Sequence, residues 1–175
     1  GEMNRKLLIL VTISVLVGGT AIYLNNIESE LPAGTIEISN KVNGKYLVVD
    51  DKTGYVVQGQ DNAKSFCWLP IPQPDETTAF QYVCSGKYHN HYLGIEDSVT
   101  SDEYLRLMVR QLLVPGAIWH VESKGDETYT YENSHDSFKG YYIAIEVDGL
   151  PKIFFGDIGP KARWHQNSFT LIKES

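Results

Sequence analysis

The sequence repeats one pentapeptide pattern three times, as Tyr46-Leu-Val-Val-Asp50, Tyr92-Leu-Gly-Ile-Glu96 and Tyr142-Ile-Ala-Ile-Glu146. Each copy reads tyrosine, leucine or isoleucine, any residue, valine or isoleucine, and an acid. The copies begin 46 and 50 residues apart. A pattern that returns at a nearly constant period indicates that the chain is built from repeated structural units.

The residues on both sides of each pentapeptide are repeated as well. An alternating run precedes each copy, at 35–38, 80–83 and 128–131. A second run of β-branched and aromatic residues follows, at 55–57, 104–107 and 153–155. A large aromatic residue closes each unit, at Trp68, Trp119 and Phe169. Four strands in each of three units predict an all-β domain of twelve short strands.

This arrangement resembles the β-trefoil superfamily over nearly all of residues 34–175, with repeats at about 34–77, 78–126 and 127–175. The resemblance implies pseudo-threefold symmetry, in which the first and fourth strands of each unit form a six-stranded barrel and the second and third form a hairpin cap. We expect six repeated aromatic side chains to fill the core: Tyr46, Tyr92, Tyr142, Trp68, Trp119 and Phe169. A two-sheet sandwich is the alternative, because it is also built from evenly spaced short strands.

The first 27 residues form a hydrophobic leader. Arg5 and Lys6 precede an apolar run, and no charged residue follows until Glu28. This pattern predicts a secretory signal peptide cleaved after Ala21, or alternatively an uncleaved membrane anchor with a cytosolic N-terminus. Gly1 and Glu2, ahead of Met3, are interpreted as residues added outside the natural chain. We therefore expect a secreted or membrane-anchored domain that meets the membrane only through this segment.

Cys67 and Cys84 are the two cysteines of the chain. A hairpin centred between Asp75 and Glu76 places them directly opposite each other on paired strands. Facing cysteines meet the distance requirement of a disulfide, and export delivers the domain to an oxidising compartment. We predict a Cys67–Cys84 disulfide, with a pair of buried reduced thiols as the alternative.

Composition excludes several classes of function. The 175 residues include 15 Lys and Arg against 22 Asp and Glu, which gives a net charge of −7. A surface of that sign repels a phosphate backbone, so no nucleic-acid partner is predicted. The chain contains no Gly-x-Ser-x-Gly, phosphate-loop or dinucleotide motif, and we predict no catalytic residues, metal or cofactor.

Binding through loops is the function that remains. The stretch Leu31–Asn40 resembles the opening of fungal trefoil protease inhibitors and of ricin-B-like lectins, and 115–121 and 168–172 are similar to their unit endings. The first hypothesis is a protease inhibitor whose exposed loop, Asp51, Lys52 and Thr53, presents Lys52 to a trypsin-like protease. The alternatives are a glycan-binding or adhesion module using the aromatic residues Tyr88 and Trp164, and a structural subunit of an exported or membrane complex.

Overall fold

The computed structural model describes residues 31–60, 64–96, 105–146 and 148–168, together with the backbone of 7–9 and 27–29. The chain divides into two compact units, Gly34–Thr170 and a smaller one formed by Gly1–Ala33 with Leu171–Ser175. In the smaller unit, β1 (Leu7–Ile9) pairs antiparallel with β2 (Ile27–Ser29). The predicted cleavage site after Ala21 and most of the apolar leader lie outside the described residues. No helix among the described residues is long and apolar enough to cross a membrane.

The described residues of the larger unit form twelve strands and three short 3₁₀ helices. The strands of the first copy are β3 (Ile36–Asn40), β4 (Tyr46–Val49), β5 (Val56–Gly59) and β6 (Trp68–Gln73). Those of the second are β7 (Thr77–Tyr82), β8 (Tyr92–Ile95), β9 (Leu107–Arg110) and β10 (Trp119–Ser123), with η1 (Pro115–Ala117) before β10. Those of the third are β11 (Thr128–Asn133), β12 (Tyr141–Ile145), β13 (Pro151–Phe155) and β14 (Trp164–Ser168), with η2 (Asp136–Phe138) and η3 (Gly159–Ala162).

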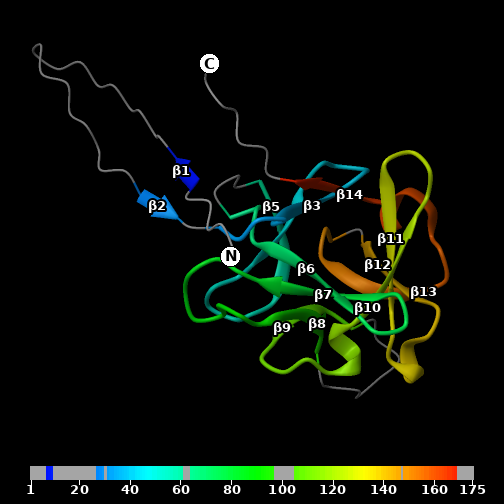
Figure 1. The fold of residues 1–175 in the computed structure, drawn as a ribbon. Helices are drawn as coiled ribbons and strands as arrows, with labels where there is room; N and C mark the ends of the chain where they lie inside the picture. Colours follow the sequence, from blue (N-terminus) through cyan, green and yellow to red (C-terminus); the bar gives the residue numbers. More distant parts are fainter. Residues whose placement is uncertain are drawn as a thin grey trace, which may run out of the picture. The chain divides into compact units, whose positions relative to one another are not determined.

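Six of these strands close into a barrel (Figure 1). The hydrogen-bonded ring runs β3, β6, β7, β10, β11, β14 and back to β3. A closed ring leaves no unpaired sheet edge, and it consists of the first and fourth strands of each copy. The second and third strands pair as hairpins, β4–β5, β8–β9 and β12–β13. The predicted all-β fold of three four-stranded units is confirmed.

The register of the barrel repeats in all three copies. Trp68 pairs with Tyr82, Trp119 with Asn133, and Trp164 with Asn40. One backbone hydrogen bond recurs beside each pair, from Val83 N to Cys67 O, from Ser134 N to Ile118 O, and from Lys41 N to Arg163 O, at 2.8, 3.0 and 2.9 Å. These equivalences relate each residue of one copy to its counterparts in the other two.

Three tryptophans close the three units, and all have no exposed surface. Each indole N–H donates to a carbonyl in the second strand of its own copy: Trp68 to Leu47, Trp119 to Leu93 and Trp164 to Ile143, at 3.0, 2.9 and 2.9 Å. A buried indole needs such a partner, so each bond fixes the cap hairpin to the barrel. The prediction that Phe169 closes copy three is therefore wrong, because Trp164 does; Phe169 lies outside the described residues.

The repeated tyrosines do not fill the core as predicted. Tyr46, Tyr92 and Tyr142 are only half-buried, whereas the aliphatic residue after each one is fully buried. Successive side chains of a strand point to opposite faces, so Leu47 and its counterparts take the inward position. Tyr46 and Tyr92 begin their strands and Tyr142 is the second residue of β12. The three tyrosines lie across from Ser39, Gln81 and Glu132 of the first strands.

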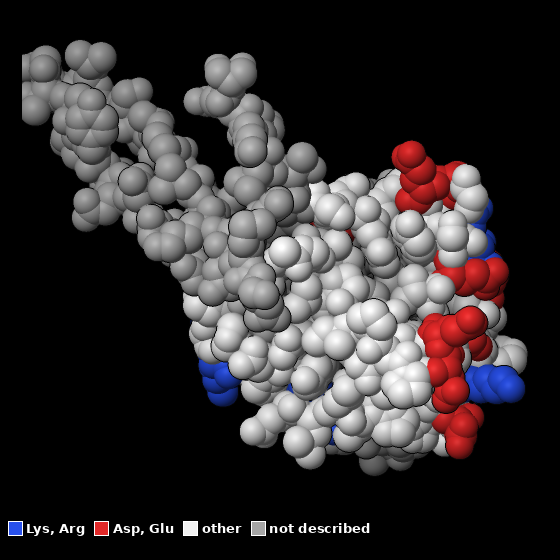
Figure 2. Space-filling model, viewed as in Figure 1, with Lys and Arg blue, Asp and Glu red and all other residues white. Residues whose placement is uncertain are grey.

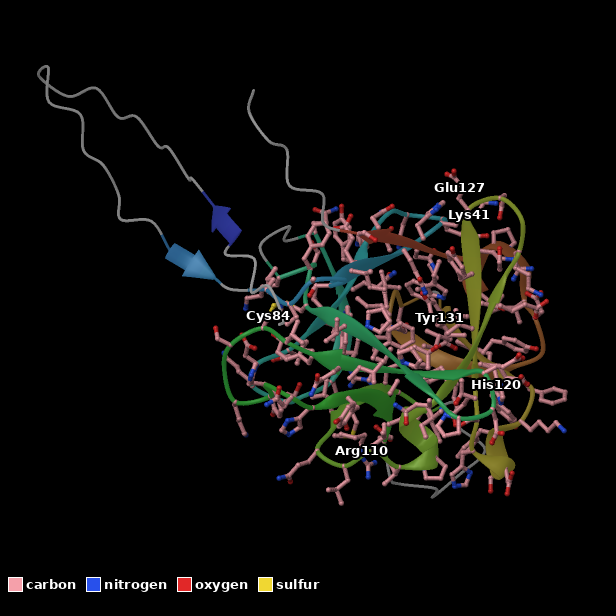
Figure 3. All side chains as sticks on the ribbon, viewed as in Figure 1. Lys41, Cys84, Arg110, His120, Glu127 and Tyr131 are labelled. Atoms are coloured by element: carbon pink, nitrogen blue, oxygen red, sulfur yellow. A yellow bond between two sulfur atoms is a disulfide. The ribbon has the colours of Figure 1, made fainter. Side chains whose placement is uncertain are left out.

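In each copy, one first-strand residue pairs with a closing tryptophan: Asn40, Tyr82 or Asn133. The side chain two positions before that residue points into the barrel. Ile38, Phe80 and Tyr131 are fully buried there, and the rings of Phe80 and Tyr131 meet edge to face at 5.5 Å. Figure 3 shows Tyr131 inside the fold, where its hydroxyl accepts a hydrogen bond from Gln166 Nε2 at 2.6 Å. The sequence repeat therefore corresponds to threefold layers of packed side chains.

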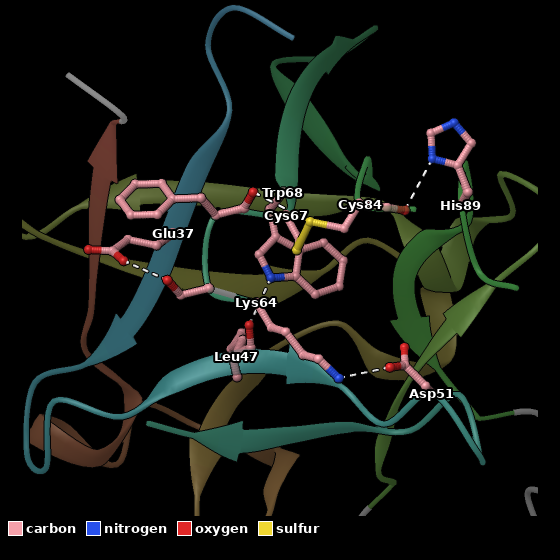
Figure 4. The surroundings of a disulfide bond; sticks show 10 residues. Glu37, Leu47, Asp51, Lys64, Cys67, Trp68, Cys84 and His89 are labelled. Carbon is pink, nitrogen blue, oxygen red and sulfur yellow. Dashed lines mark hydrogen bonds and ion pairs between the residues drawn. A yellow bond between two sulfur atoms is a disulfide. The ribbon is translucent and has the colours of Figure 1, made fainter. Parts of the chain in front are cut away.

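The predicted disulfide is present, although the predicted register is off by one residue. Trp68 pairs with Tyr82, not with Val83, because the β6–β7 turn contains three residues, Pro74 to Glu76. Asp75 and Glu76 both adopt left-handed backbone angles in this turn, with φ of 61° and 58°. Cys67 and Cys84 join just beyond the strand ends, with Cα atoms 5.1 Å apart, a separation typical of disulfides (Figure 4).

The disulfide lies where the other two copies have an asparagine clamp. Asn133 donates from Nδ2 to the Gly116 carbonyl at 3.0 Å and accepts from the His135 N–H at 3.0 Å. Asn40 makes the same two bonds, to Lys161 O and from Val42 N, at 3.0 and 2.9 Å.

In copy two the clamp position is Tyr82, whose ring meets Trp68 edge to face at 5.6 Å and makes no such clamp. The segment before Trp68 is instead joined covalently to the segment after Tyr82 by Cys67 and Cys84. The disulfide thus takes over, in copy two, the structural role of the asparagine.

We expect the free energy of unfolding of the double variant Cys67→Ala/Cys84→Ala to be about 3 kcal/mol lower than that of the wild type. The reason is that a bridge between residues 17 apart in sequence restricts the unfolded chain. Urea denaturation with and without a reductant measures this difference. Reductant should destabilise the wild type and leave the variant unchanged. Equal stability of wild type and variant would mean that the β6–β7 segment is held without the disulfide.

Candidate functional site

The predicted inhibitory loop is a closed turn between β4 and β5. The Asp50 carboxylate accepts the Lys52 N–H at 2.9 Å, and the Asp50 carbonyl accepts the Gly54 N–H at 2.8 Å. The bond from Lys52 is the main reason that the pKa of Asp50 lies below its ordinary value. Asp51 forms an ion pair with Lys64 at 2.8 Å. Asp51, Lys52 and Thr53 are all exposed, with Lys52 in the middle of the turn.

The two residues predicted for glycan binding do not form a site together. Trp164 is fully buried in barrel strand β14, so the prediction that it faces solvent is wrong. Tyr88 lies in the β7–β8 loop and is half-buried. Its ring packs against Gly54, where an added Cβ would be 3.0 Å from the ring, and meets the His91 ring edge to face at 5.4 Å. Little of the Tyr88 ring is free to stack on a ligand.

Copy three carries a surface cluster that we call the aromatic row. The ring centroids of neighbouring members lie 5.3, 5.6 and 5.4 Å apart along the series His135, Phe138, Tyr141 and Phe155. Phe155 is 70% exposed at the end of β13, directly across from Tyr141 on β12. His135, Phe138 and Tyr141 are half-buried, so the row is an exposed Phe155 ring backed by partly covered rings that connect it to the core.

Gly140 holds the Phe155 ring in place. This residue has φ +83°, and a Cβ added to it would lie 3.2 Å from Phe155 Cε2, so the ring lies against bare backbone. The Gly156 N–H donates to the Gly140 carbonyl at 2.8 Å, and the Gly140 N–H donates to Glu132 Oε2 at 2.6 Å. One glycine thus contacts both an exposed aromatic ring and a carboxylate.

Acidic groups surround this part of copy three. Burial raises the pKa of Tyr142, and the neighbouring charge of Glu132 raises it further. Figure 2 shows Asp and Glu side chains gathered along one edge of the molecule, on the side where Figure 1 shows β11 and β13. A carboxylate beside an apolar ring accepts hydrogen bonds from hydroxyl groups and repels anions.

Asp157, two residues after Phe155, anchors the segment that leaves β13. Its carboxylate accepts two bonds from the Arg163 guanidinium, at 2.6 and 2.7 Å, and one from the Gly159 N–H at 3.0 Å. The hydrogen bonds from the Arg163 guanidinium are the main reason that the pKa of Asp157 is lowered to about 2. This pair fixes η3 and the residues that follow the aromatic row.

Metal binding has no candidate site in the part of the chain that the structure describes. No three His, Cys, Asp or Glu side chains there lie close enough together to hold an ion. His89 and His91 lie on either side of Asn90, a residue with φ 67°. The Nδ1 atom of His89 is 3.1 Å from the Cys84 carbonyl, so this ring is used within the loop (Figure 4).

Comparison with solved structures decides the fold. A designed protein of threefold symmetry, ThreeFoil, matches with a TM-score of 0.65 and 16% identity over 78% of this chain and 99% of its own. A ricin B-like lectin of Macrolepiota procera, solved with lactose, matches with a TM-score of 0.61 and 14% identity over 81% of this chain and 100% of its own. The chain is a β-trefoil. No protein-family model and no curated protein matches the sequence.

The β-trefoil fold also occurs in parts of longer enzymes. An exo-β-1,3-galactanase of Clostridium thermocellum matches with a TM-score of 0.62 and 19% identity over 81% of this chain. A GlcNAcα1-4Gal-releasing endo-β-galactosidase of Clostridium perfringens matches with a TM-score of 0.62 and 15% identity over 78% of this chain. The trefoil spans 32% of the length of each enzyme.

Sequence reasoning missed the aromatic row of the trefoil. The available signal was the pair Phe154-Phe155 in a predicted strand, because only one of two successive side chains can point inward. Phe154 is 8% exposed and Phe155 is 70% exposed. The sequence does not reveal that Gly140 and Glu132 lie beside the outward ring.

We expect Asp157→Asn to lower the free energy of unfolding at neutral pH by about 1 kcal/mol or less, because the ion pair is partly exposed. The folded state lowers the pKa of Asp157 from 3.8 to about 2. Its stabilising effect is therefore complete well above pH 3.8 and is lost as the pH falls toward about 2. Urea titrations across this range should show the two proteins converging at acid pH. A difference that does not change with pH would contradict this role for the charge.

Proposed function

We propose that the β-trefoil domain binds a glycan and that the aromatic row of copy three is its binding surface. The observation that carries the proposal is the exposed Phe155 ring, which is backed by Tyr141 and packs on Gly140, the residue whose N–H donates to the Glu132 carboxylate. A pyranose ring has apolar C–H faces and a rim of hydroxyl groups. An aromatic ring with an adjacent acceptor matches both features.

The charge around the row favours an uncharged sugar. Glu132, Glu122 and Asp157 all raise the pKa of Tyr142, and Lys124 opposes them. Asp157 pairs with Arg163 and Glu122 pairs with Lys124, so among these three carboxylates Glu132, which accepts the Gly140 N–H, contributes most to the local potential. A sialylated, sulfated or uronic sugar would bring a second anion to this acidic surface.

Galactose-containing glycans are the first ligands to test. One similar structure is a lectin with lactose, and two others belong to enzymes named for galactan or galactoside cleavage. These matches are at most 19% identical to the chain, so they support a choice of probe and do not define the ligand. We propose that the domain binds without catalysing a reaction and works outside the cytosol, where its disulfide is stable.

Replacing the exposed ring tests this proposal. Phe155→Ala should weaken binding to a neutral glycan, with lactose as the first probe, at least tenfold, because the stacking surface is lost. The melting temperature should stay nearly unchanged, since an exposed side chain contributes little to stability. Binding is measured first on a glycan array and then by titration calorimetry.

Leu112 offers a matched control, because it is also 70% exposed and belongs to copy two. Leu112→Ala should bind as the wild type does. The proposal fails if the wild type binds no glycan on the array, or if Phe155→Ala and Leu112→Ala bind equally well.

Protease inhibition through Asp51, Lys52 and Thr53 stays a prediction. If the loop inhibits a trypsin-like protease, Lys52→Ala should remove the inhibition and leave the melting temperature unchanged, because Lys52 is exposed in its turn. A panel of serine and cysteine proteases measures this. No inhibition by the wild type would reject the inhibitor hypothesis and leave the glycan proposal intact.

A further inference from the structure

We infer that the trefoil has one glycan site and not three, so that each chain is monovalent. This inference rests on the proposed function and concerns the same surface. The hairpin pairing of the three copies corresponds up to this position, where β13 continues to Phe155 while β5 and β9 end at Gly59 and Arg110, and the side chains differ. The threefold register therefore identifies which residues replace the aromatic row in copies one and two.

The cap hairpins define the correspondence. Tyr142 lies opposite Phe154, Tyr46 opposite Gly59, and Tyr92 opposite Arg110. The residue that follows each partner occupies the Phe155 position. These residues are Phe155 in copy three, Gln60 in copy one and Gln111 in copy two.

One feature of the supporting backbone recurs in each copy. A left-handed residue lies two positions before each of Tyr46, Tyr92 and Tyr142. These residues are Gly44, Asn90 and Gly140, with φ of 67°, 67° and 83°. Each copy could therefore present a ring in this place. The choice of side chain decides whether it does.

Copy one has no aromatic side chain at these positions. Lys45 replaces Tyr141, Gly59 replaces Phe154 and Gln60 replaces Phe155. Amide groups cover the hairpin instead, because Asn43 Nδ2 donates to Gln58 Oε1 at 3.0 Å. Residues 61–63, which follow Gln60, are Asp, Asn and Ala, so they supply no aromatic ring.

Copy two keeps an aromatic pair without an exposed stacking face. His91 replaces Tyr141 and meets Tyr88, whose ring is covered by Gly54 and has Lys87 Nζ 5.2 Å from its centroid. The carboxylate is also missing, since Gln81 occupies the position of Glu132. Gln111 stands at the Phe155 position, so no aromatic side chain occupies it.

A single site has a functional consequence. A chain with three equivalent sites can cross-link glycans and gains affinity from simultaneous contacts. A chain with one site attaches itself to one glycan and gains nothing from neighbouring glycans. This β-trefoil therefore anchors its own chain to a glycan surface and does not join two surfaces together.

Titration calorimetry on the monomeric chain, with lactose as the first neutral glycan, tests the inference. The wild type should bind one ligand per chain. Phe155→Gln, which gives copy three the side chain of the other copies, should abolish all binding. Gln60→Ala and Gln111→Ala should leave both affinity and stoichiometry unchanged.

Failure of the single-site inference and failure of the proposed glycan binding give different results. A stoichiometry of two or three, or residual binding in a folded Phe155→Gln variant, would overturn the single site while glycan binding stands. No binding of the wild type to any neutral glycan on the array would overturn the proposed function, and the single site with it.

Discussion

The hydrogen bond from a buried indole to the second strand of its own copy is the interaction on which the rest of the structure depends. Trp68, Trp119 and Trp164 each make it, at 3.0, 2.9 and 2.9 Å. Each bond joins a barrel strand to a cap hairpin, so the three together fix the hairpins that carry the surface residues. Because the indoles are fully buried, this frame is insulated from changes at the surface.

The three copies differ in sequence at positions that do not take part in the tryptophan-to-hairpin hydrogen bonds. At the barrel rim, Asn40 and Asn133 clamp two of the junctions, and the Cys67–Cys84 disulfide joins the third. At the hairpin ends, each copy has a left-handed residue, and among the described residues an exposed phenylalanine ring packs against it in copy three. A symmetric core with asymmetric surface residues lets one copy acquire a binding surface while the others keep polar side chains.

The repeated pentapeptides and the alternating runs predicted twelve strands in three units, because period and alternation are local properties. The identity of the residue that closes copy three depends on the pairing of distant strands and not on the neighbouring sequence. Spacing favoured Phe169, whereas the short η3 segment brings Trp164 into register with Asn40. The tyrosines were assigned to the core by their size, yet the aliphatic residue after each takes the inward face. The site was missed because Phe155 reaches Gly140 only through the β12–β13 pairing, and Glu132 reaches Gly140 from β11.

Mapping a neutral glycan by NMR tests the central claim most directly, namely that one copy of a common frame carries the binding surface. On addition of lactose, the account predicts shifts of the Gly140 and Gly156 amides. It predicts unchanged amides at Gly44 and Asn90, the equivalents of Gly140, and unchanged indole N–H signals of the three buried tryptophans. Shifts of comparable size at Gly44, Asn90 and Gly140, or shifts confined to another face of the barrel, would contradict it.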